Sequence, residues 1–271
     1  MRYPMIVCDL DGTLLDSSGA VSGRTAAAVR HAQDHGHVFV IATARPVRDT
    51  RPVAHALGGH PIAVCGNGSV VFDFGRDEIV SYRPLAHESV GGVLDALRTR
   101  FPGIRLGAEC GLDLLLEEGF ELPPALSRDA RRVGALAGDT RGGHGFGKLM
   151  VQLDGAADGY HERVRELLTG YEVTVSGGGF CEVMQGGVTK AAALELTAGR
   201  LGLSGGDAVA FGDMPNDLPV FAWSATSVAV ANAHPTVLAA ADEVTASNDE
   251  HGVARWLERL CATPWERPSV P

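Results

Sequence analysis

Two aspartates that follow a short apolar run are the first candidates for chemistry in this sequence. The run Met-Ile-Val-Cys at 5–8 leads directly into Asp9-Leu10-Asp11-Gly12-Thr13. An apolar run without polar alternation is typical of a strand buried on both faces, and ligands bind beyond the carboxyl ends of strands in an open parallel sheet. We therefore predict that Asp9 and Asp11 point into one crevice. Their carboxylate oxygens are the ligand type that Mg²⁺ prefers.

Three further segments bring polar groups to the same edge of the predicted sheet. The segment Gly212-Asp213-Met214-Pro215-Asn216-Asp217 follows another apolar run. Thr43 and Ala44 end a strand predicted at 38–43, where a hydroxyl and backbone N–H groups suit phosphate oxygens. Lys190 opens a predicted helix, so that its ammonium and the positive end of the helix dipole act together on an anion. In combination these segments predict a metal-and-phosphate site.

Each feature taken alone has an ordinary structural interpretation. An acidic pair after a strand is also typical of an exposed turn, a single Thr43 is typical of a strand-end hydroxyl, and a single Lys190 is typical of a surface lysine. The site is favoured because all four segments fall at a strand end or a helix start.

The elements that must position these residues alternate between strand and helix at both ends of the chain. This order predicts an α/β fold with a doubly wound, Rossmann-like parallel sheet and right-handed crossovers. The predicted core strands are 5–9, 38–43, 61–66, 208–212, 227–231 and a short one at Val244, with a hairpin at 70–82. The predicted core helices are 22–35, 48–57, 189–201, 216–223, 235–241 and 253–260.

The middle of the chain has a different order and predicts an inserted α+β domain with an antiparallel sheet. We place this cap domain at 84–185, between core segments 1–83 and 186–271. It contains a loosely patterned stretch at 123–147, rich in Arg, Gly and Pro. Its predicted helices are 88–100 and 160–168, and its predicted strands are 104–110, 112–117, 149–153, 171–176 and 180–184.

Charge and composition exclude several classes of function. Acidic residues outnumber basic residues by 33 to 23 in 271, giving a formal net charge of −10, which disfavours nucleic acid and anionic membranes as partners. The 5 cysteines form no CxxC pair, so a zinc ribbon or a disulfide scaffold is not expected. The first apolar run comes too early for a signal-peptide core. We expect a cytoplasmic protein with reduced thiols, and nothing in the sequence requires more than a monomer.

The motif set resembles the haloacid dehalogenase (HAD) superfamily, in its phosphatase branch. The similar motifs are Asp9-x-Asp11-Gly12-Thr13, Thr43, Lys190 and Gly212-Asp213-x-x-Asn216-Asp217. Further segments are similar to the Cof-type subfamily with a C2-type cap: Thr43-x-Arg45, Asn67-Gly68, 187–190, Asn232-Ala233 and Asn248-x-x-x-Gly252-Val253. One departure is Ala44, where these proteins usually have glycine; we expect its methyl group to tune the phosphate pocket.

The resemblance implies a mechanism and a substrate class. Asp9 is expected to attack phosphorus and form an aspartyl-phosphate, and Asp11 to protonate the leaving alkoxide and then deprotonate water. The substrates implied are small phosphorylated metabolites, most commonly sugar phosphates. The Mg²⁺ ligands implied are Asp9, the backbone carbonyl of Asp11 and Asp213, with Asp217 as a ligand or close by. The phosphate-binding groups implied are Thr43, the N–H groups of Leu10 and Ala44, Asn216 and Lys190.

Two other functions fit part of the same pattern. A phosphotransferase or phosphomutase would pass the phosphoryl group from Asp9 to a sugar hydroxyl, and the sequence does not separate it from a hydrolase. A non-catalytic signalling receiver also gathers acids and a lysine at a sheet edge. A receiver needs neither an inserted cap nor an aspartate two residues after the acceptor, so it is disfavoured.

Two weaker motifs point to other ligands. The segment 142–148 matches half of a P-loop, but Leu149 stands where Mg²⁺ requires Ser or Thr and a strand is predicted where a helix is needed. His31 and His35 have the i, i+4 spacing of zinc ligands, but Ala32 stands where the H-E-x-x-H motif needs glutamate. A linker and a solvated helix face are the favoured interpretations.

Overall fold

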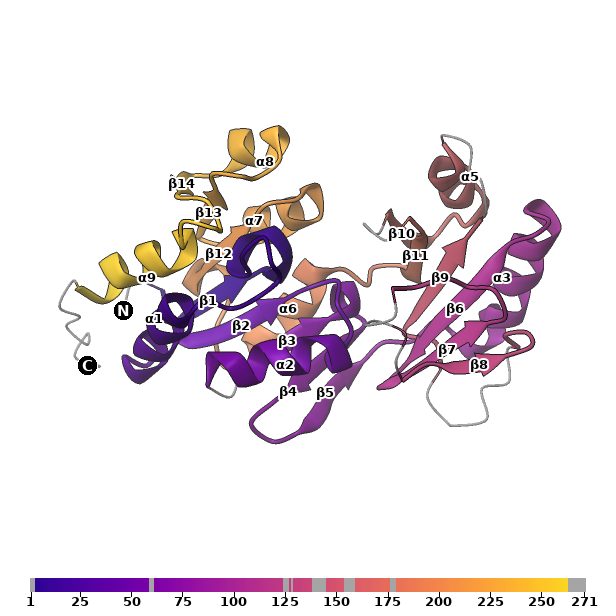
Figure 1. Ribbon diagram of the computed structural model, residues 1–271, viewed down its shortest axis with the longest axis horizontal. Coiled ribbons are helices and arrows are strands. Elements are labelled where there is room, and N and C mark those ends of the chain that lie inside the picture. Colours follow the sequence, from indigo (N-terminus) through magenta and orange to yellow (C-terminus); the bar gives the residue numbers. More distant parts are fainter. Residues whose placement is uncertain are drawn as a thin grey trace. The chain divides into compact units, whose positions relative to one another are not determined.

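The chain folds into two units, shown in a computed structural model that describes residues 3–58, 61–123, 127, 129–137, 145–153, 159–175 and 179–262 (Figure 1). The first unit, here the core, comprises Met1–Val80 and Lys190–Pro271. The second unit, here the cap, is Ser81–Thr189. The boundaries predicted from the sequence differ from these by a few residues.

The described strands of the core form an eight-stranded sheet in the order β14-β13-β12-β1-β2-β3-β4-β5. Every neighbouring pair from β14 to β3 is parallel, and β4 is antiparallel to β3. The antiparallel edge arises because tight turns join β3 to β4 and β4 to β5, whereas parallel neighbours need a long crossover. The predicted α/β fold class is confirmed. The strands are β1 Met5–Cys8, β2 Val38–Ala42, β3 Ile62–Cys65, β4 Val70–Asp73, β5 Glu78–Tyr82, β12 Ala208–Gly212, β13 Thr226–Val230 and β14 Glu243–Thr245.

The core helices fall into two contacting groups, as a doubly wound sheet requires. One group joins α1 to α2 and α9, and the other joins α7 to α6 and α8. Local signals set their ends: the Ser22 hydroxyl accepts from the Thr25 N–H at 3.1 Å at the start of α1, and Gly58 ends α2 with a φ of 68°. The helices are α1 Gly23–Asp34, α2 Val47–Leu57, α6 Lys190–Arg200, α7 Leu218–Trp223, α8 Pro235–Ala240 and α9 Gly252–Ala262.

The register of the central strands brings the predicted site residues to one edge of the sheet. Strand β1 is completely buried between β12 and β2, and Cys8 pairs with Phe211 on one side and Ile41 on the other. The residues that follow these three positions therefore leave the sheet side by side. They are the sequence segments that carry Asp9, Asp213 and Thr43.

The described strands of the cap form a separate six-stranded sheet in the order β10-β11-β9-β6-β7-β8. The sheet is antiparallel except for β7 and β8, which are parallel. Its strands are β6 Arg105–Cys110, β7 Asp113–Glu117, β8 Arg131–Val133, β9 Lys148–Gln152, β10 Tyr171–Val175 and β11 Cys181–Gln185. Its helices include α3 His87–Arg100 and α5 Tyr160–Leu167.

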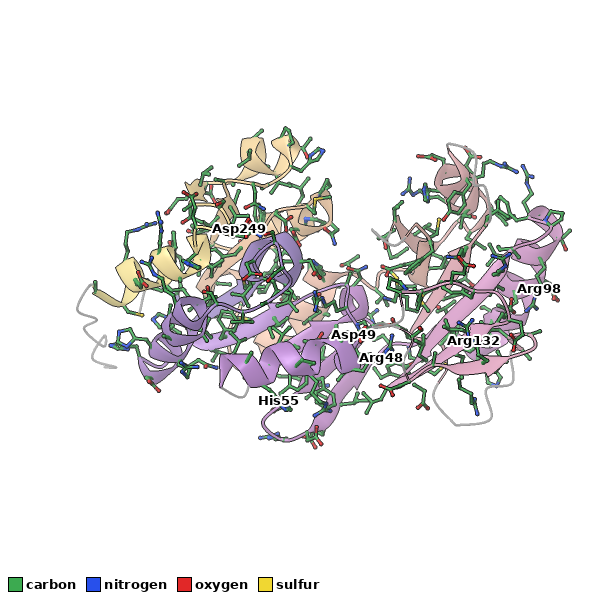
Figure 2. All side chains as sticks on the ribbon, in the orientation of Figure 1. Arg48, Asp49, His55, Arg98, Arg132 and Asp249 are labelled. Atoms are coloured by element: carbon green, nitrogen blue, oxygen red, sulfur yellow. The ribbon has the colours of Figure 1, made fainter. Side chains whose placement is uncertain are left out.

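Strand β8 lies in the stretch at 123–147 for which the sequence predicts no element. Its three residues carry no apolar alternation, and one of its side chains holds it in place. The Arg132 guanidinium, labelled in Figure 2, donates to the carbonyls of Glu117 and Phe120 at 3.1 and 2.7 Å. Residues 138–144 of that stretch, including the first three residues of the P-loop-like segment, and Ser176 at the end of a predicted strand lie outside the described residues.

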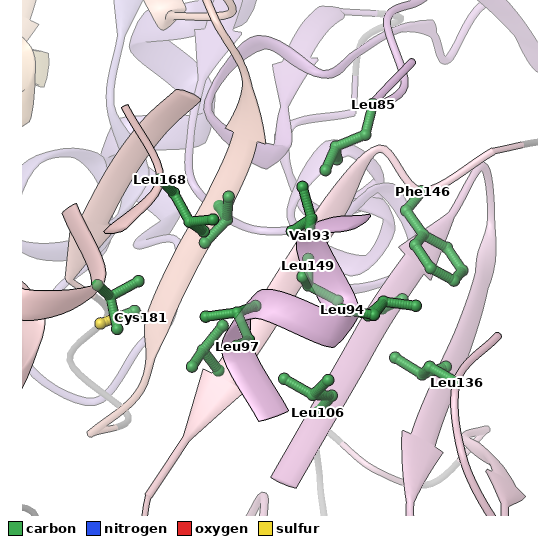
Figure 3. Packing of buried hydrophobic residues seen from close by; sticks show 14 of the residues in the cluster. Leu85, Val93, Leu94, Leu97, Leu106, Leu136, Phe146, Leu149, Leu168 and Cys181 are labelled. Carbon is green, nitrogen blue, oxygen red and sulfur yellow. The ribbon is translucent and has the colours of Figure 1, made fainter. Parts of the chain in front are cut away.

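The cap has a hydrophobic core of its own. Helix α3 buries Val90, Val93, Leu94 and Leu97, whose spacing of three and four residues forms one face of a helix. These side chains pack against residues of the cap sheet such as Leu106 (Figure 3). The cap can thus hold its own shape while it is inserted into the core sequence. No helix in the described ranges has the length and apolar character needed to cross a membrane.

Candidate active site

The turn that follows β1 is shaped around Asp9 and Gly12. The Asp9 N–H donates to the Phe211 carbonyl of β12 at 3.0 Å, which continues the sheet by one residue. The chain then makes one wide turn, closed by the Leu15 N–H on the Leu10 carbonyl at 2.9 Å. Gly12 has a φ of 79°, and a Cβ at this position would collide with the Asp213 carboxylate. Glycine is therefore required here for both its conformation and its size.

Lys190 is the electrostatic centre of the site. Its Nζ donates to Asp9 Oδ1 at 2.6 Å and to Asp217 Oδ1 at 2.8 Å, and all three side chains are buried. Burial alone would lower the pKa of Lys190, but the Asp9 and Asp217 carboxylates outweigh it and raise that pKa. The lysine is thus held as an ammonium among carboxylates. It is not the surface lysine that was the alternative interpretation of its position at a helix start, because its side chain is buried.

The turn that follows β12 fixes Asp213 and Asp217. The Thr13 hydroxyl donates to Asp213 Oδ1 at 2.7 Å, and Asp217 Oδ2 accepts from the N–H groups of Asp213 and Met214, both at 3.1 Å. A Cβ on Gly212 would lie 2.6 Å from that of Asp217, so only glycine allows this close approach. Asp217 therefore links Lys190 to the backbone of the turn that carries Asp213.

Oxygen atoms from Asp9, Asp213 and Asp217 lie within 4.8 Å of one another and could hold a metal ion. Burial raises the pKa of Asp9 well above its ordinary range; Lys190 opposes this shift, and the neighbouring carboxylates add to it. Burial likewise raises the pKa of Asp213 to about 6. Three buried carboxylates with one lysine leave excess negative charge, and the donor set is all oxygen. This chemistry fits Mg²⁺.

The Asp11 carboxylate does not belong to this group in the described structure. It is 59% exposed and is bound on both oxygens by Arg45, whose Nε donates to Oδ2 at 2.8 Å and whose Nη2 donates to Oδ1 at 2.5 Å. Arg45 is a site residue whose role the sequence did not reveal. The sequence signal that could have identified Arg45 is its position two residues after Thr43, in a motif on which the family resemblance already rests.

The segment for which phosphate binding is predicted follows β2 and forms a hydrogen-bonded turn. Thr43 is buried, its N–H donates to the Val64 carbonyl at 2.8 Å, and its hydroxyl accepts from the Arg45 N–H at 3.1 Å. The loop after β3 crosses this turn, with the Asn67 N–H on the Thr43 carbonyl at 3.1 Å. Of the other predicted phosphate-binding residues, Ala44 is half-buried, Leu10 is buried and Asn216 is exposed.

Two asparagines from the C-terminal third of the sequence hold the turn that carries Asp9 and Asp11. Asn232 Nδ2 donates to the Gly12 carbonyl at 2.7 Å, and Asn232 Oδ1 accepts from the Asn248 N–H at 2.9 Å. Asn248 Nδ2 in turn donates to the Leu15 carbonyl at 2.9 Å. From the sequence, Asn232 and Asn248 were known only as part of the motifs that carry the resemblance. Their side-chain amides hold the turn that carries Asp11 in place. These hydrogen bonds are a structural explanation for the presence of both asparagines in the motif.

Comparison with known families agrees with this geometry. The model of the haloacid dehalogenase-like hydrolases matches residues 6–128 and 140–257. The chain belongs to this family. The HAD resemblance predicted from the motifs is confirmed, and so is the prediction of a phosphatase.

Relatives of this HAD-like hydrolase match along nearly its whole length. A phosphoglycolate phosphatase of Archaeoglobus fulgidus is 28% identical, over 94% of this chain and 96% of the relative. A 5-amino-6-(5-phospho-D-ribitylamino)uracil phosphatase of Bacillus subtilis is 27% identical, over 93% of both chains. The crystal structure of a haloacid dehalogenase-like hydrolase from Bacteroides thetaiotaomicron superposes with a TM-score of 0.81 at 26% identity, covering 96% of this chain and all of the other.

Proposed function

We propose that this HAD-like phosphatase hydrolyses phosphate monoesters of small metabolites, depends on Mg²⁺ and forms an aspartyl-phosphate on Asp9. The observation that carries the proposal is the buried cluster in which Lys190 contacts Asp9 and Asp217 beside Asp213. A nucleophile, a cation site and an ammonium for phosphate oxygens come together there. Each of them is needed for phosphoryl transfer, in which positioning and charge stabilisation supply most of the rate.

The first step transfers the phosphoryl group to the protein. A carboxylate oxygen of Asp9 forms a bond to phosphorus while the bond from phosphorus to the ester oxygen breaks. Asp11 gives its proton to the leaving alkoxide. For this the protonated oxygen of the Asp11 carboxyl has to exchange Arg45 for the ester oxygen, while the other oxygen keeps its bond from Arg45, and the exposure of the side chain leaves room for that movement.

The groups around the phosphoryl oxygens neutralise their charge. Lys190, Thr43, the N–H groups of Leu10 and Ala44, and Asn216 are the donors that we assign to this task. Asp9 and Asp213, with the backbone carbonyl of Asp11, would hold Mg²⁺, and Asp217 would orient Lys190 and the Asp213 turn. When bound, Mg²⁺ supplies positive charge to the transferring oxygens.

The second step regenerates the protein. Asp11, now ionised, takes a proton from a water molecule whose oxygen bonds to phosphorus as the Asp9–phosphorus bond breaks. Inorganic phosphate leaves, and Asp9 and Asp11 return to their starting states.

For the substrate we propose sugar phosphates. The two relatives described above are named for phosphoglycolate and for a phosphoribityl compound, which are phosphate monoesters of small hydroxylated molecules. A phosphate-release screen over phosphorylated metabolites tests this class. Release without an added acceptor supports hydrolysis, and isomeric products without free phosphate would instead support a mutase.

The Asp9→Asn variant tests the nucleophile. We expect hydrolysis of an aryl phosphate to fall by about 10³-fold or more, because an amide cannot form the acyl phosphate, while substrate binding persists. The matched control is Asp77→Asn, at an exposed turn position with a φ of 55° that asparagine tolerates. EDTA should silence the wild-type enzyme and Mg²⁺ restore it. Substantial turnover by Asp9→Asn, or full activity in EDTA, would contradict the proposal.

A further inference from the structure

A second cluster of metal-ligating side chains lies where α1 and α9 of the core meet. It consists of His31 and His35 at the end of α1 and Cys261 at the end of α9, with ligand atoms within 4.8 Å of one another. The sequence favours a solvated helix face for the two histidines because Ala32 stands where the H-E-x-x-H motif needs glutamate. The structure adds a third ligand-type side chain from a position more than two hundred residues away in the chain.

The pairing of the two helices fixes this meeting point. Helices α1 and α9 are in contact (Figure 1). The Ser22 hydroxyl is 3.1 Å from His251 Nδ1, and Arg24 donates to both carboxylate oxygens of Glu258 at 2.8 and 2.6 Å. Residue numbers rise together along both helices, so the helices run in the same direction. Their last turns, which carry the histidines and Cys261, are held next to each other.

The hydrogen bonding of His35 leaves one nitrogen ready to bind a metal. His35 Nδ1 lies 2.8 Å from the His31 carbonyl oxygen, which only accepts, so Nδ1 carries the proton and Nε2 keeps its lone pair. Metal-bound histidines almost always make such a bond from their other nitrogen to a carbonyl or carboxylate. Among the described residues, no hydrogen bond occupies a ring nitrogen of His31.

The charge environment also favours a cation. Helix α1 ends at Asp34 and α9 at Ala262, so the negative ends of two helix dipoles meet at this point. Cys261 is the one cysteine of the five that is not fully buried. Partial burial raises the pKa of its thiol, so a bound metal has to displace the proton to solvent, as metals do with coordinating thiols.

We propose that His31, His35 and Cys261 form a binding site for a zinc-class divalent ion, separate from the carboxylate site. Two imidazole nitrogens and one thiolate suit Zn²⁺ or Co²⁺, and the fourth tetrahedral position stays open. Tetrahedral Zn²⁺ places such ligand atoms about 3.4–3.6 Å apart, so ligand atoms at the 4.8 Å limit would have to close by roughly an ångström. The ion would join the last turn of α1 to that of α9.

Titration of the reduced, EDTA-treated and desalted full-length protein with Co²⁺ alone tests the site. We expect a thiolate-to-cobalt charge-transfer band that saturates at one ion per chain, because only a cysteine ligand gives such a band. Excess Zn²⁺ should abolish it by displacement. His31→Gln and His35→Gln should weaken binding on the order of tenfold or more. Cys261→Ser should remove the band.

Two control variants separate this site from the other thiols and carboxylates of the chain. His161→Gln removes the histidine of another His–Cys pair, in which His161 Nδ1 lies 3.1 Å from Cys181 Sγ, and should leave the band intact. Cys8→Ala removes the thiol next to Asp9 and should also leave it intact. A band that survives in Cys261→Ser, or no band in the wild type, would overturn the proposal. The three site variants should retain Mg²⁺-supported phosphatase activity, so this test is independent of the proposed reaction.

Discussion

At the scale of single residues, the contact between Arg45 and Asp11 bears most directly on the reaction. A bidentate arginine fixes the plane of a carboxylate as well as its position. Asp11 is thus held by a partner on a neighbouring turn, at 2.8 and 2.5 Å, while its side chain remains 59% exposed. We infer that Arg45 positions Asp11, the acid–base residue of the proposed reaction.

Arg45→Ala should therefore slow the hydrolysis of substrates with poor leaving groups more than that of substrates with good leaving groups. An alkyl phosphate needs a proton on its leaving oxygen, so we expect kcat to fall on the order of 10²-fold, whereas an aryl phosphate with a stable leaving anion should lose only a few-fold. Steady-state kinetics with both substrates measures the difference. Arg51→Ala is the control, because Arg51 also pairs with a carboxylate, that of Asp77 at 2.6 Å, away from this contact. Equal losses for both substrates would speak against a positioning role.

The sequence predicts the convergence of Asp9, Asp213 and Lys190 better than it predicts their individual contacts. Strand ends and a helix start fix where those backbone positions lie, and the structure places all three in one buried cluster. The direction of a side chain depends on its neighbours. For that reason the sequence could not show that Asp11 turns to Arg45, or that Asp217 divides its oxygens between Lys190 and a backbone turn.

At the scale of elements, the turn after β1 depends on segments that follow β13 and precede α9. Asn232 lies just after β13 and uses both atoms of its amide, one on the Gly12 carbonyl and one on the Asn248 N–H. The Asp213 carbonyl is likewise fixed, by the His234 N–H at 2.8 Å. Three loops at the same sheet edge thus restrain one another and the turn that carries Asp9 and Asp11.

Asn232→Ala should loosen this arrangement. Removing both bonds is expected to lower the free energy of unfolding by about 1–3 kcal/mol and to reduce kcat/KM for an aryl phosphate as the turn at Gly12 moves. Denaturant unfolding and steady-state kinetics measure the two effects. Gln152→Ala in the cap is a matched control, since its amide also makes two backbone bonds, both to Glu121, at 2.8 and 3.0 Å. The idea fails if the two variants reduce kcat/KM equally.

Most elements could be predicted because they carry apolar runs or helical periodicity. Strand β1 is the clearest case, since all four of its residues are buried and apolar. Strand β8 is the opposite case: Arg131-Arg132-Val133 has no apolar pattern, and its place depends on the hydrogen bonds of Arg132 to remote carbonyls. Such a strand is set by tertiary contacts and leaves no local signal.

At the scale of the whole molecule, the core and the cap each have their own sheet and their own buried residues. The insertion could be predicted because the strand–helix alternation stops and later returns. The strand order could not be predicted, because the alternation of strands and helices does not show that β12 lies beside β1. Long-range pairing of this kind is decided by how all the strands pack together.

Leu97→Ala should destabilise the cap selectively. Leu97 is fully buried in the cap cluster (Figure 3), and a cavity there typically costs about 2–5 kcal/mol. We expect faster hydrogen exchange at amides of α3 and β6, with amides of β1 and β12 little changed. Leu112→Ala, at a cap position that is 47% exposed, should have almost no effect. Equal acceleration of hydrogen exchange in the core and in the cap would show that the two units unfold together.

The pairing of β1 with β12 has a consequence for biosynthesis. Strand β1 emerges from the ribosome before the cap, but the neighbour that pairs Met5 with Ala208 and Cys8 with Phe211 emerges only after the entire cap. At about 5–20 residues per second, β1 waits on the order of ten seconds or more with an open hydrogen-bonding edge. A nascent chain stalled after Thr189 but before Ala208 therefore has a complete cap but lacks Asp213 and Asp217, and its uncovered strand is a point at which quality control can recognise it.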